Sequence, residues 1–231
     1  MALITPKING SSITAGTVAN ARLSSSAIAG TGPYEFITEK IWTSNGEHDS
    51  DTYARIFFTN IFDKTKYSSY KIILHWLGYE AIGNLQIRMQ TGTAANSSGQ
   101  RSGAIYYGNN VYMDSQNTTY HNERHEASNQ GTLFTNIWPV DRGGLTGEFN
   151  ITHVAHSPTA SKIDDHFRPY IYGTLVGYYN GAQYRRVDIQ SRCNESQNGN
   201  FYTGFQLFLS TATTVSQGSH ISVYGIRWST T

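Results

Sequence analysis

The last part of the sequence constrains the fold more than any other stretch. Between Gly204 and Trp228, the run GFQLFLSTATTVSQGSHISVYGIRW holds two apolar segments separated by a short Ser/Thr-rich segment. Apolar residues that recur with period two, interrupted by turn-forming residues, are typical of paired β-strands. We therefore expect a terminal β-hairpin that closes an all-β core.

Similar segments recur along the chain from Tyr34 onward, and clusters of Gly, Asn and Ser separate them. A chain of 231 residues is long enough for one all-β domain with a substantial core. The sequence thus predicts a single jelly-roll-like β-sandwich of about eight to ten strands over residues 34–231. The expected strands are 54–60, 70–77, 84–90, 104–107, 133–138, 145–153, 169–177, 183–190, 204–209 and 221–228.

Two of these segments predict their own buried faces. In NLQIRMQ (84–90), the apolar residues share one face and the polar residues share the other, which indicates one face on the core and one toward water or a neighbour. In YRRVDIQ (184–190), Arg185 shares a face with Val187 and Ile189, so we expect that face to be only partly buried. The Asn180–Gly181 pair before this segment predicts a two-residue hairpin turn.

The first 33 residues differ from the rest of the chain. They contain no aromatic residue, although the sequence has 16 Tyr, 4 Trp and 10 Phe, and their apolar residues stand alone, four or five positions apart. Such a segment cannot build its own core, so we expect an extended N-terminal arm, with a disordered tail as the alternative. The residues expected to anchor the arm on another chain are Ile4, Ile8, Ile13, Val18, Leu23 and Ile28.

Composition argues against several classes of function. The net charge is +1 and no long basic run is present, so we expect no nucleic-acid binding. No segment approaches the roughly 20 apolar residues of a membrane helix or resembles a signal peptide, so we expect a protein made in a cytoplasm and not inserted in a membrane. A lone cysteine, Cys193, favours a small residue in or near a strand over a disulfide or a zinc ligand. We expect no cofactor.

Two histidines four positions apart are a possible metal-binding pair. His121 and His125 in HNERH would face the same side of a helix, but the surrounding segment is rich in Asn and has no apolar stripe. Glu123 is also one place late for the HExxH pattern of metalloproteases. We therefore expect a solvated loop here and no metal site.

Acidic residues leave one enzymatic alternative open. Asp164, Asp165 and His166 form a polar cluster, and Asp164 with Glu148 could form the carboxylate pair of a glycosidase. Such pairs need a defined separation of the two carboxyl groups, and surface acids are the commoner outcome. The chain has neither a GxSxG elbow nor a GxxxxGK phosphate loop, so we expect no catalytic residue.

The abundance of tyrosine points toward binding. Tyr and Trp on an exposed sheet face or loop can stack on sugar rings or fill a protein interface, although many aromatics merely cover sheet surfaces. The candidates for such contacts are Tyr106, Tyr107, Tyr112, Tyr178 and Tyr179.

Several of these phrases resemble β-sandwich modules of tailed-phage virion proteins, especially those of marine and cyanobacterial phages. The closing VYGI (223–226) is similar to an LYGI phrase that ends such modules, and ITAGTVANARL (13–23) is similar to linker phrases of tail fibres. Residues 54–90 and the segment LTGEFNITH (145–153) resemble further strands of the same modules. The resemblance implies an oligomeric virion structural protein and carries no catalytic residue.

We therefore expect a non-enzymatic phage virion protein, attached by its arm to other virion proteins and projecting its sandwich as a tail fibre or receptor-binding head. A homotrimer is favoured by the likeness to fibres, and a host surface glycan is a candidate partner. A capsid decoration protein is the alternative within this class. A carbohydrate-binding module or glycan depolymerase is the alternative from another class.

Overall fold

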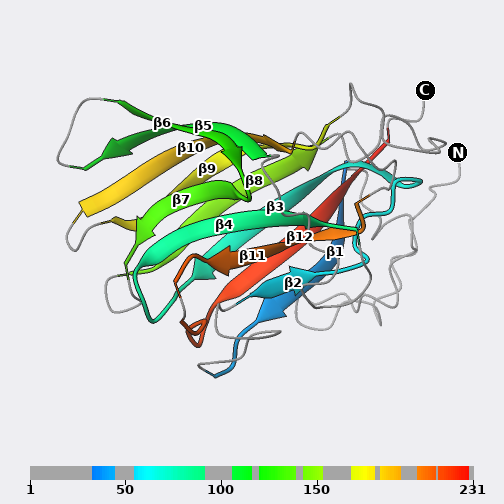
Figure 1. Ribbon diagram of the computed structural model, residues 1–231. Helices are drawn as coiled ribbons and strands as arrows, with labels where there is room; N and C mark the ends of the chain where they lie inside the picture. The colour runs from blue at the N-terminus through cyan, green and yellow to red at the C-terminus, as the bar shows by residue number, and fades with distance from the viewer. Residues whose placement is uncertain are drawn as a thin grey trace, which may run out of the picture.

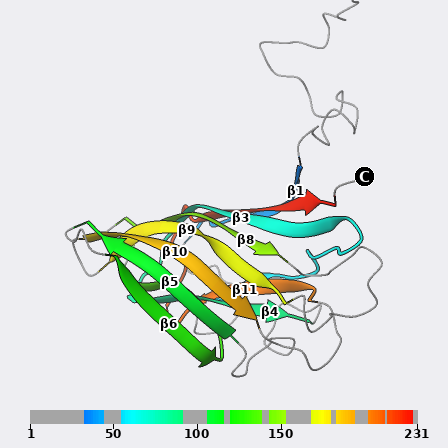
Figure 2. The same ribbon diagram turned by 90° about the horizontal axis from the view of Figure 1, so that it is seen from above.

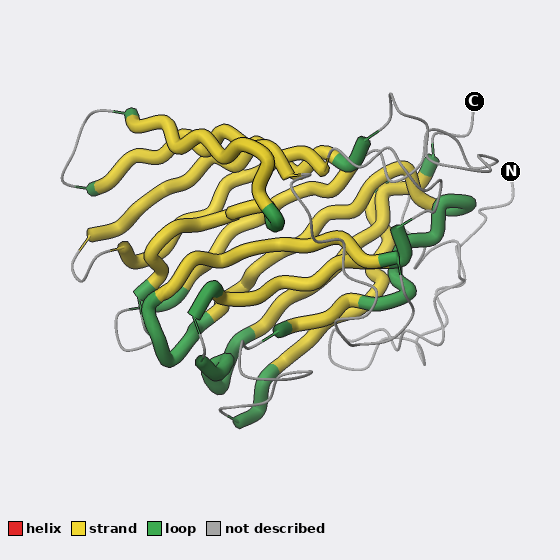
Figure 3. The backbone as a smooth tube through the Cα atoms, viewed as in Figure 1, coloured by secondary structure: helices red, strands yellow, loops and turns green. Residues whose placement is uncertain are grey.

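A computed structural model describes nine stretches of the chain: 33–44, 55–91, 106–115, 120–138, 143–152, 168–179, 183–193, 202–211 and 213–228. Within them the protein consists of β-strands and loops (Figure 3). The all-β prediction is therefore confirmed. Among these residues no helix is long and apolar enough to span a membrane.

Twelve strands form one curled sheet, more than the eight to ten expected, and every strand pair is antiparallel. That the twelve strands form a single β-sandwich stays a prediction. The strands are β1 (Tyr34–Ile41), β2 (Ile56–Phe58), β3 (Tyr67–Leu77), β4 (Gly83–Gln90), β5 (Tyr106–Asp114), β6 (His121–Ser128), β7 (Gly131–Ile137), β8 (Leu145–Thr152), β9 (Tyr170–Tyr179), β10 (Gln183–Cys193), β11 (Gly204–Leu209) and β12 (His220–Arg227).

The sheet branches at β9. One branch runs β1-β12-β3-β8-β9-β10-β5-β6, and the other runs β7-β4-β11-β2. Ile137 of β7 pairs with Tyr179 of β9 and joins them. Figures 1 and 2 show β5 and β6 at one end of the curled sheet and β1 and β12 at the other.

The two branches share one hydrophobic core. Phe149 of β8 meets Phe205 of β11 edge to face, with ring centroids 6.4 Å apart, and the Met89 backbone N–H of β4 donates to the hydroxyl of Tyr106 on β5 at 2.8 Å. Fully burying one such large apolar side chain stabilises the fold by about 1.5–3 kcal/mol. The inner face of the eight-stranded branch is therefore covered, and its other face is the one available for binding.

Alternation in the sequence locates the buried face correctly in β10. Arg185, Val187 and Ile189 point inward and are buried, whereas Tyr184 and Arg186 are exposed. The expectation that the inward face is only partly buried was wrong, because Arg185 is neutralised there by an acid described below. In β4 the apolar face is buried as predicted, but Gln86 and Gln90 on the other face are buried too.

The predicted terminal hairpin is wrong, although both of its strands exist. Strand β11 pairs with β4 and β2, whereas β12 pairs with β1 and β3 in the other branch. Residues 210–219 therefore cross from one branch to the other. The polar segment looked like a turn because a crossing loop needs the same Gly, Ser and Thr residues.

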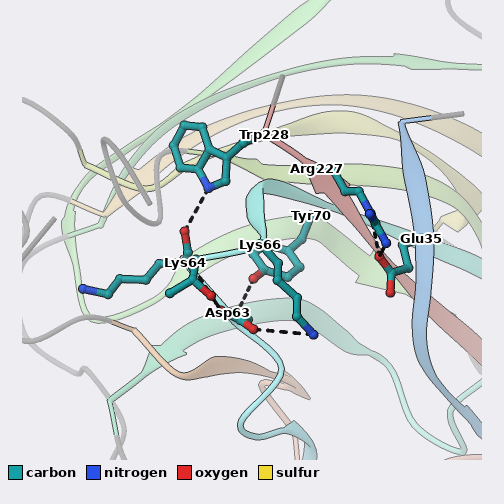
Figure 4. Close-up of polar contacts among 8 residues, drawn as sticks. Glu35, Asp63, Lys64, Lys66, Tyr70, Arg227 and Trp228 are labelled. Atoms are coloured by element: carbon teal, nitrogen blue, oxygen red, sulfur yellow. Dashed lines mark hydrogen bonds and ion pairs between the residues drawn. The ribbon is translucent and has the colours of Figure 1, made fainter. Parts of the chain in front are cut away.

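Side chains hold the end of β12 in place (Figure 4). Trp228 Nε1 donates to the backbone carbonyl of Lys64 at 2.8 Å, and Arg227 Nη2 lies 2.6 Å from Glu35 Oε2 on β1. The hydrogen bond from Arg227 lowers the pKa of Glu35 below its ordinary value. In the turn before β3, the backbone N–H of Asp63 donates to the hydroxyl of Tyr70 at 2.6 Å. The last strand is thus tied both to the edge strand and to the turn before β3.

Two strands were missed, and both are edge strands of the eight-stranded branch. β1 mixes exposed apolar and charged residues, and β6 covers HNERH, where a solvated loop was expected. β6 is held by backbone pairing with β5 rather than by an apolar face. Polar edge strands of this kind prevent edge-to-edge aggregation and carry no hydrophobic pattern to detect.

The hairpin of β9 and β10 is confirmed, with Tyr179 opposite Gln183. The expected two-residue turn at Asn180–Gly181 lies outside the described residues. The predicted arm, including its six anchor residues, also lies outside them, as do Asp164, Asp165 and His166.

Candidate functional site

A groove of about 730 Å³ lies on the outer face of the eight-stranded branch, across β9, β10, β5 and β6. Its volume is in the range of small-ligand sites. Antiparallel pairing brings residues from four strands together there, since side chains on one face of neighbouring strands stand side by side. The lining residues are Tyr107, Gly108, Asn109, Asn122, Arg124, Tyr170, Gln190, Ser191 and Arg192.

One row of the groove places an arginine between two tyrosines. Arg192 of β10 is in register with Tyr107 of β5 on one side and with Tyr170 of β9 on the other. The guanidinium carbon of Arg192 lies 5.7 Å from the centre of the Tyr107 ring. Two strand spacings separate the tyrosines, about 10 Å between backbones. Aromatic rings at this separation, with a donor between them, suit a ligand that has flat faces and polar edges.

A further tyrosine lies beside this row, on the same strand as Tyr170. Tyr172 stacks on Tyr170 with ring centroids 5.7 Å apart and is 41% exposed. On the opposite side, Asn109 is in register with Arg124 of β6. The groove therefore combines aromatic rings with amide and guanidinium donors, the mixture that recognises the hydroxyl-rich edges of sugars.

A buried ion pair joins β5 and β10. It lies where β5 ends and β10 begins. Arg185 donates from Nε to Asp114 Oδ1 at 2.6 Å, from Nη2 to Asp114 Oδ2 at 3.2 Å and from Nη1 to Thr135 Oγ1 at 3.0 Å. Its guanidinium carbon lies 3.8 Å from the ring centre of Tyr112 and 3.3 Å from that of Tyr179. This cluster locks the register of β5 on β10, and hence the positions of Tyr107 and Arg192.

The five predicted tyrosines therefore have different environments. Tyr107 lines the groove. Tyr106 is buried, and burial raises the pKa of its phenol well above the usual value, so its ring offers no face to a ligand. Tyr112 and Tyr179 clamp Arg185, and Tyr178 packs on the exposed Tyr184 with ring centroids 4.1 Å apart.

Comparison with known proteins identified no relative: no family model, no curated protein and no solved structure matches this chain.

A second polar cluster, on the outer face near β1, resembles a catalytic triad in composition. Ser222 Oγ lies 3.0 Å from Nε2 of His75 and 3.3 Å from Nε2 of His220, and Nε2 of His220 lies 2.9 Å from Glu39 Oε2. In a triad the acid holds Nδ1 while Nε2 faces the serine. Here Glu39 and Ser222 share one nitrogen of His220, so this arrangement cannot relay a proton from serine to acid.

The predicted glycosidase pair cannot be measured, because Asp164 lies outside the described residues. Its other member, Glu148, lies on the outer face of β8 with its Oε2 2.7 Å from Lys71 Nζ. Glu148 therefore forms an ion pair between β8 and β3 on this face.

No three His, Cys, Asp or Glu residues within the described stretches are placed to hold a metal ion. His121 lies in β6 with its ring stacked 5.2 Å from that of Tyr112, and the backbone of His125 lies in the same strand. Cys193 is buried at the end of β10, as its predicted role in a strand requires, with its Sγ 3.2 Å from the Tyr202 hydroxyl.

Most of the groove was missed from the sequence. Tyr170 was predicted only as a residue of a strand, and Arg192 lies beyond the predicted end of its strand. Arg124 belongs to β6, which was expected to be a loop. A periodic pattern shows that Gln190 and Arg192 share the outer face of β10. It cannot show which strands are their neighbours, and the groove exists only through those neighbours.

Proposed function

We propose that this protein is a non-enzymatic attachment protein of a phage particle, whose β-sandwich binds a surface glycan of the host. The observation that supports it best is the groove across β9, β10, β5 and β6, where Tyr107, Tyr170 and Arg192 stand in one row. Its phage origin rests on the resemblance of the sequence phrases. Assembly as a homotrimer belongs to the same proposal.

The chemistry of the groove favours binding over catalysis. Tyrosine rings provide apolar faces for sugar rings, and the neighbouring amides of Asn109, Asn122 and Gln190 both donate and accept hydrogen bonds. Of the described residues that line the groove, none is a carboxylate that could act as general acid or nucleophile. A receptor-binding surface has to bind its ligand but needs no catalytic group.

Replacing Tyr107 and Tyr170 together with alanine is expected to weaken glycan binding at least tenfold, because both stacking faces are lost. Binding would first be screened on a panel of immobilised bacterial and algal polysaccharides. The affinity for each polysaccharide that the wild-type protein binds would then be measured by calorimetry. Both tyrosines lie on the outer face, so the melting temperature should change by no more than about 2 °C.

The matched control is Tyr184→Ala. This exposed tyrosine lies on the same face of β10, eight residues from Arg192 or about 27 Å along the strand. It should bind glycans like the wild type. Equal losses in the control and the double variant, or a wild type that binds no polysaccharide, would reject the groove as a glycan site.

Deleting residues 1–30 tests the attachment half of the proposal. The shortened protein is expected to remain soluble and folded, with its glycan affinity intact, but to be absent from purified particles, since the isolated apolar residues of the segment would be buried only against neighbouring chains. Quantitative mass spectrometry of particles would detect it. Normal incorporation of the shortened protein would contradict the anchoring role.

The same particles distinguish a tail protein from a capsid decoration protein. A few copies per particle relative to the major capsid protein are expected for a receptor-binding tail component. Hundreds of copies would favour the decoration role instead.

A further inference from the structure

We infer that the glycan bound in the groove is an acidic polysaccharide, and that Arg192 pairs with the carboxylate of a uronic acid residue while Tyr107 and Tyr170 stack on the sugar rings beside it. This inference rests on the proposed glycan-binding function and adds the chemical class of the ligand.

The first support is the charge of the groove. Among the described residues that line it, the charged ones are Arg124 and Arg192, and both are positive. On the same outer face, Asp188 accepts hydrogen bonds from Arg186 and Thr174, at 3.2 and 2.7 Å. Glu148 is paired with Lys71. An anionic ligand would therefore meet the guanidinium of Arg192 and, among the described lining residues, no carboxylate.

The second support is the position of Arg192. Its side chain is exposed on the outer face of β10, and its backbone register places it between the two tyrosines. A sugar ring stacked on Tyr107 or Tyr170 would hold an equatorial substituent near the guanidinium. The planar fork of an arginine matches the two oxygens of a uronate carboxylate with two parallel hydrogen bonds.

Aromatic rings and arginines on a sheet can also bind single-stranded nucleic acid. That alternative is disfavoured by the overall net charge of +1, because phosphate chains select a long basic track rather than one short row. An oligonucleotide therefore belongs in the test as a competitor.

The experiment measures the affinity of the full-length protein by calorimetry for polygalacturonate, alginate and hyaluronate, and for the carboxyl-reduced form of each. At least one uronate is expected to bind, and its carboxyl-reduced form should bind about tenfold more weakly. Raising the salt from 50 to 300 mM NaCl should weaken only the binding of the charged form, since exposed ion pairs are screened.

Arg192→Gln is expected to weaken uronate binding about tenfold while leaving the affinity for the carboxyl-reduced polymer within twofold. Arg192→Lys should be intermediate, because it keeps the charge but not the fork. Arg186→Gln is the matched control: it removes an exposed arginine from the same face of the same strand, outside the groove, and should bind like the wild type.

The other possible results would contradict either the carboxylate assignment or the glycan-binding function. If neutral polymers bind as well as uronates and Arg192→Gln changes nothing, the carboxylate assignment is wrong but the glycan-binding function stands. If a sulfated galactan binds more tightly than any uronate, the assignment of a carboxylate as the group bound by Arg192 is wrong. If a 20-residue oligothymidylate binds more tightly than any glycan, the glycan-binding function is wrong. If no polymer binds, both proposals fail.

Discussion

Asp114→Ala is expected to lower the free energy of unfolding by about 3–5 kcal/mol. Arg185 is only 3% exposed, and Asp114 supplies both carboxylate oxygens to its guanidinium. An arginine remains charged at any accessible pH. Without Asp114, the charge would stay buried between two tyrosine rings, with the Thr135 hydroxyl still accepting one hydrogen bond from it. Urea denaturation measures the loss.

Two controls separate charge from packing. Asp188→Asn alters a carboxylate on β10, the strand of Arg185, that is 39% exposed and paired with Arg186, so the change should cost less than about 1 kcal/mol. The double variant Asp114→Leu with Arg185→Met removes both charges and should regain most of the stability lost in Asp114→Ala. A double variant as unstable as the single one would show that lost packing, not a buried charge, causes the effect.

Gly147→Ala is expected to destabilise the protein by about 3 kcal/mol or more. Gly147 lies inside β8, between Leu74 of β3 and Leu175 of β9, and has a φ of +135°. A Cβ there would overlap the carbonyl oxygen of Thr174 and lie 2.9 Å from the Cα of Leu175. The substitution therefore combines an unfavourable dihedral with a clash against the backbone of a central strand.

Gly218→Ala is the control for the dihedral alone. Gly218 has a φ of +86°, but the nearest atom to its added Cβ is Trp76 Cζ3 at 3.7 Å. We expect a cost of about 1–2 kcal/mol from the backbone conformation. Equal losses for the two variants in urea denaturation would contradict the proposed contact with β9.

The sequence predicts which segments are strands better than it predicts how they pair. β11 was located to the residue, and β10 shows its alternation plainly, because one buried face imposes a period of two. The neighbours of β11 are β4 and β2, far away in the sequence, and no local pattern encodes that choice. The predicted hairpin of β11 and β12 failed for this reason.

The candidate site shows the same limit at the level of single residues. Tyr107 lines the groove, whereas its neighbour Tyr106 is buried. Composition cannot tell which of two adjacent tyrosines is buried. The alternation of inner and outer residues along β5 can, once the bounds of that strand are known. Arg185 was misjudged because a charged residue on an apolar face is buried only when a partner such as Asp114 comes from another strand.

The position of β12 has a consequence for how the protein is made. This strand, residues 220–227, lies between β1 and β3 and pairs with both along most of its length. While the ribosome is still translating the preceding residues, β1 has no partner on this side and β3 presents an open edge. Pairing across so long a sequence separation is slow, and open strand edges bind other chains. The eight-stranded branch can therefore be completed only after synthesis has passed Arg227, and nascent chains must be kept apart until then.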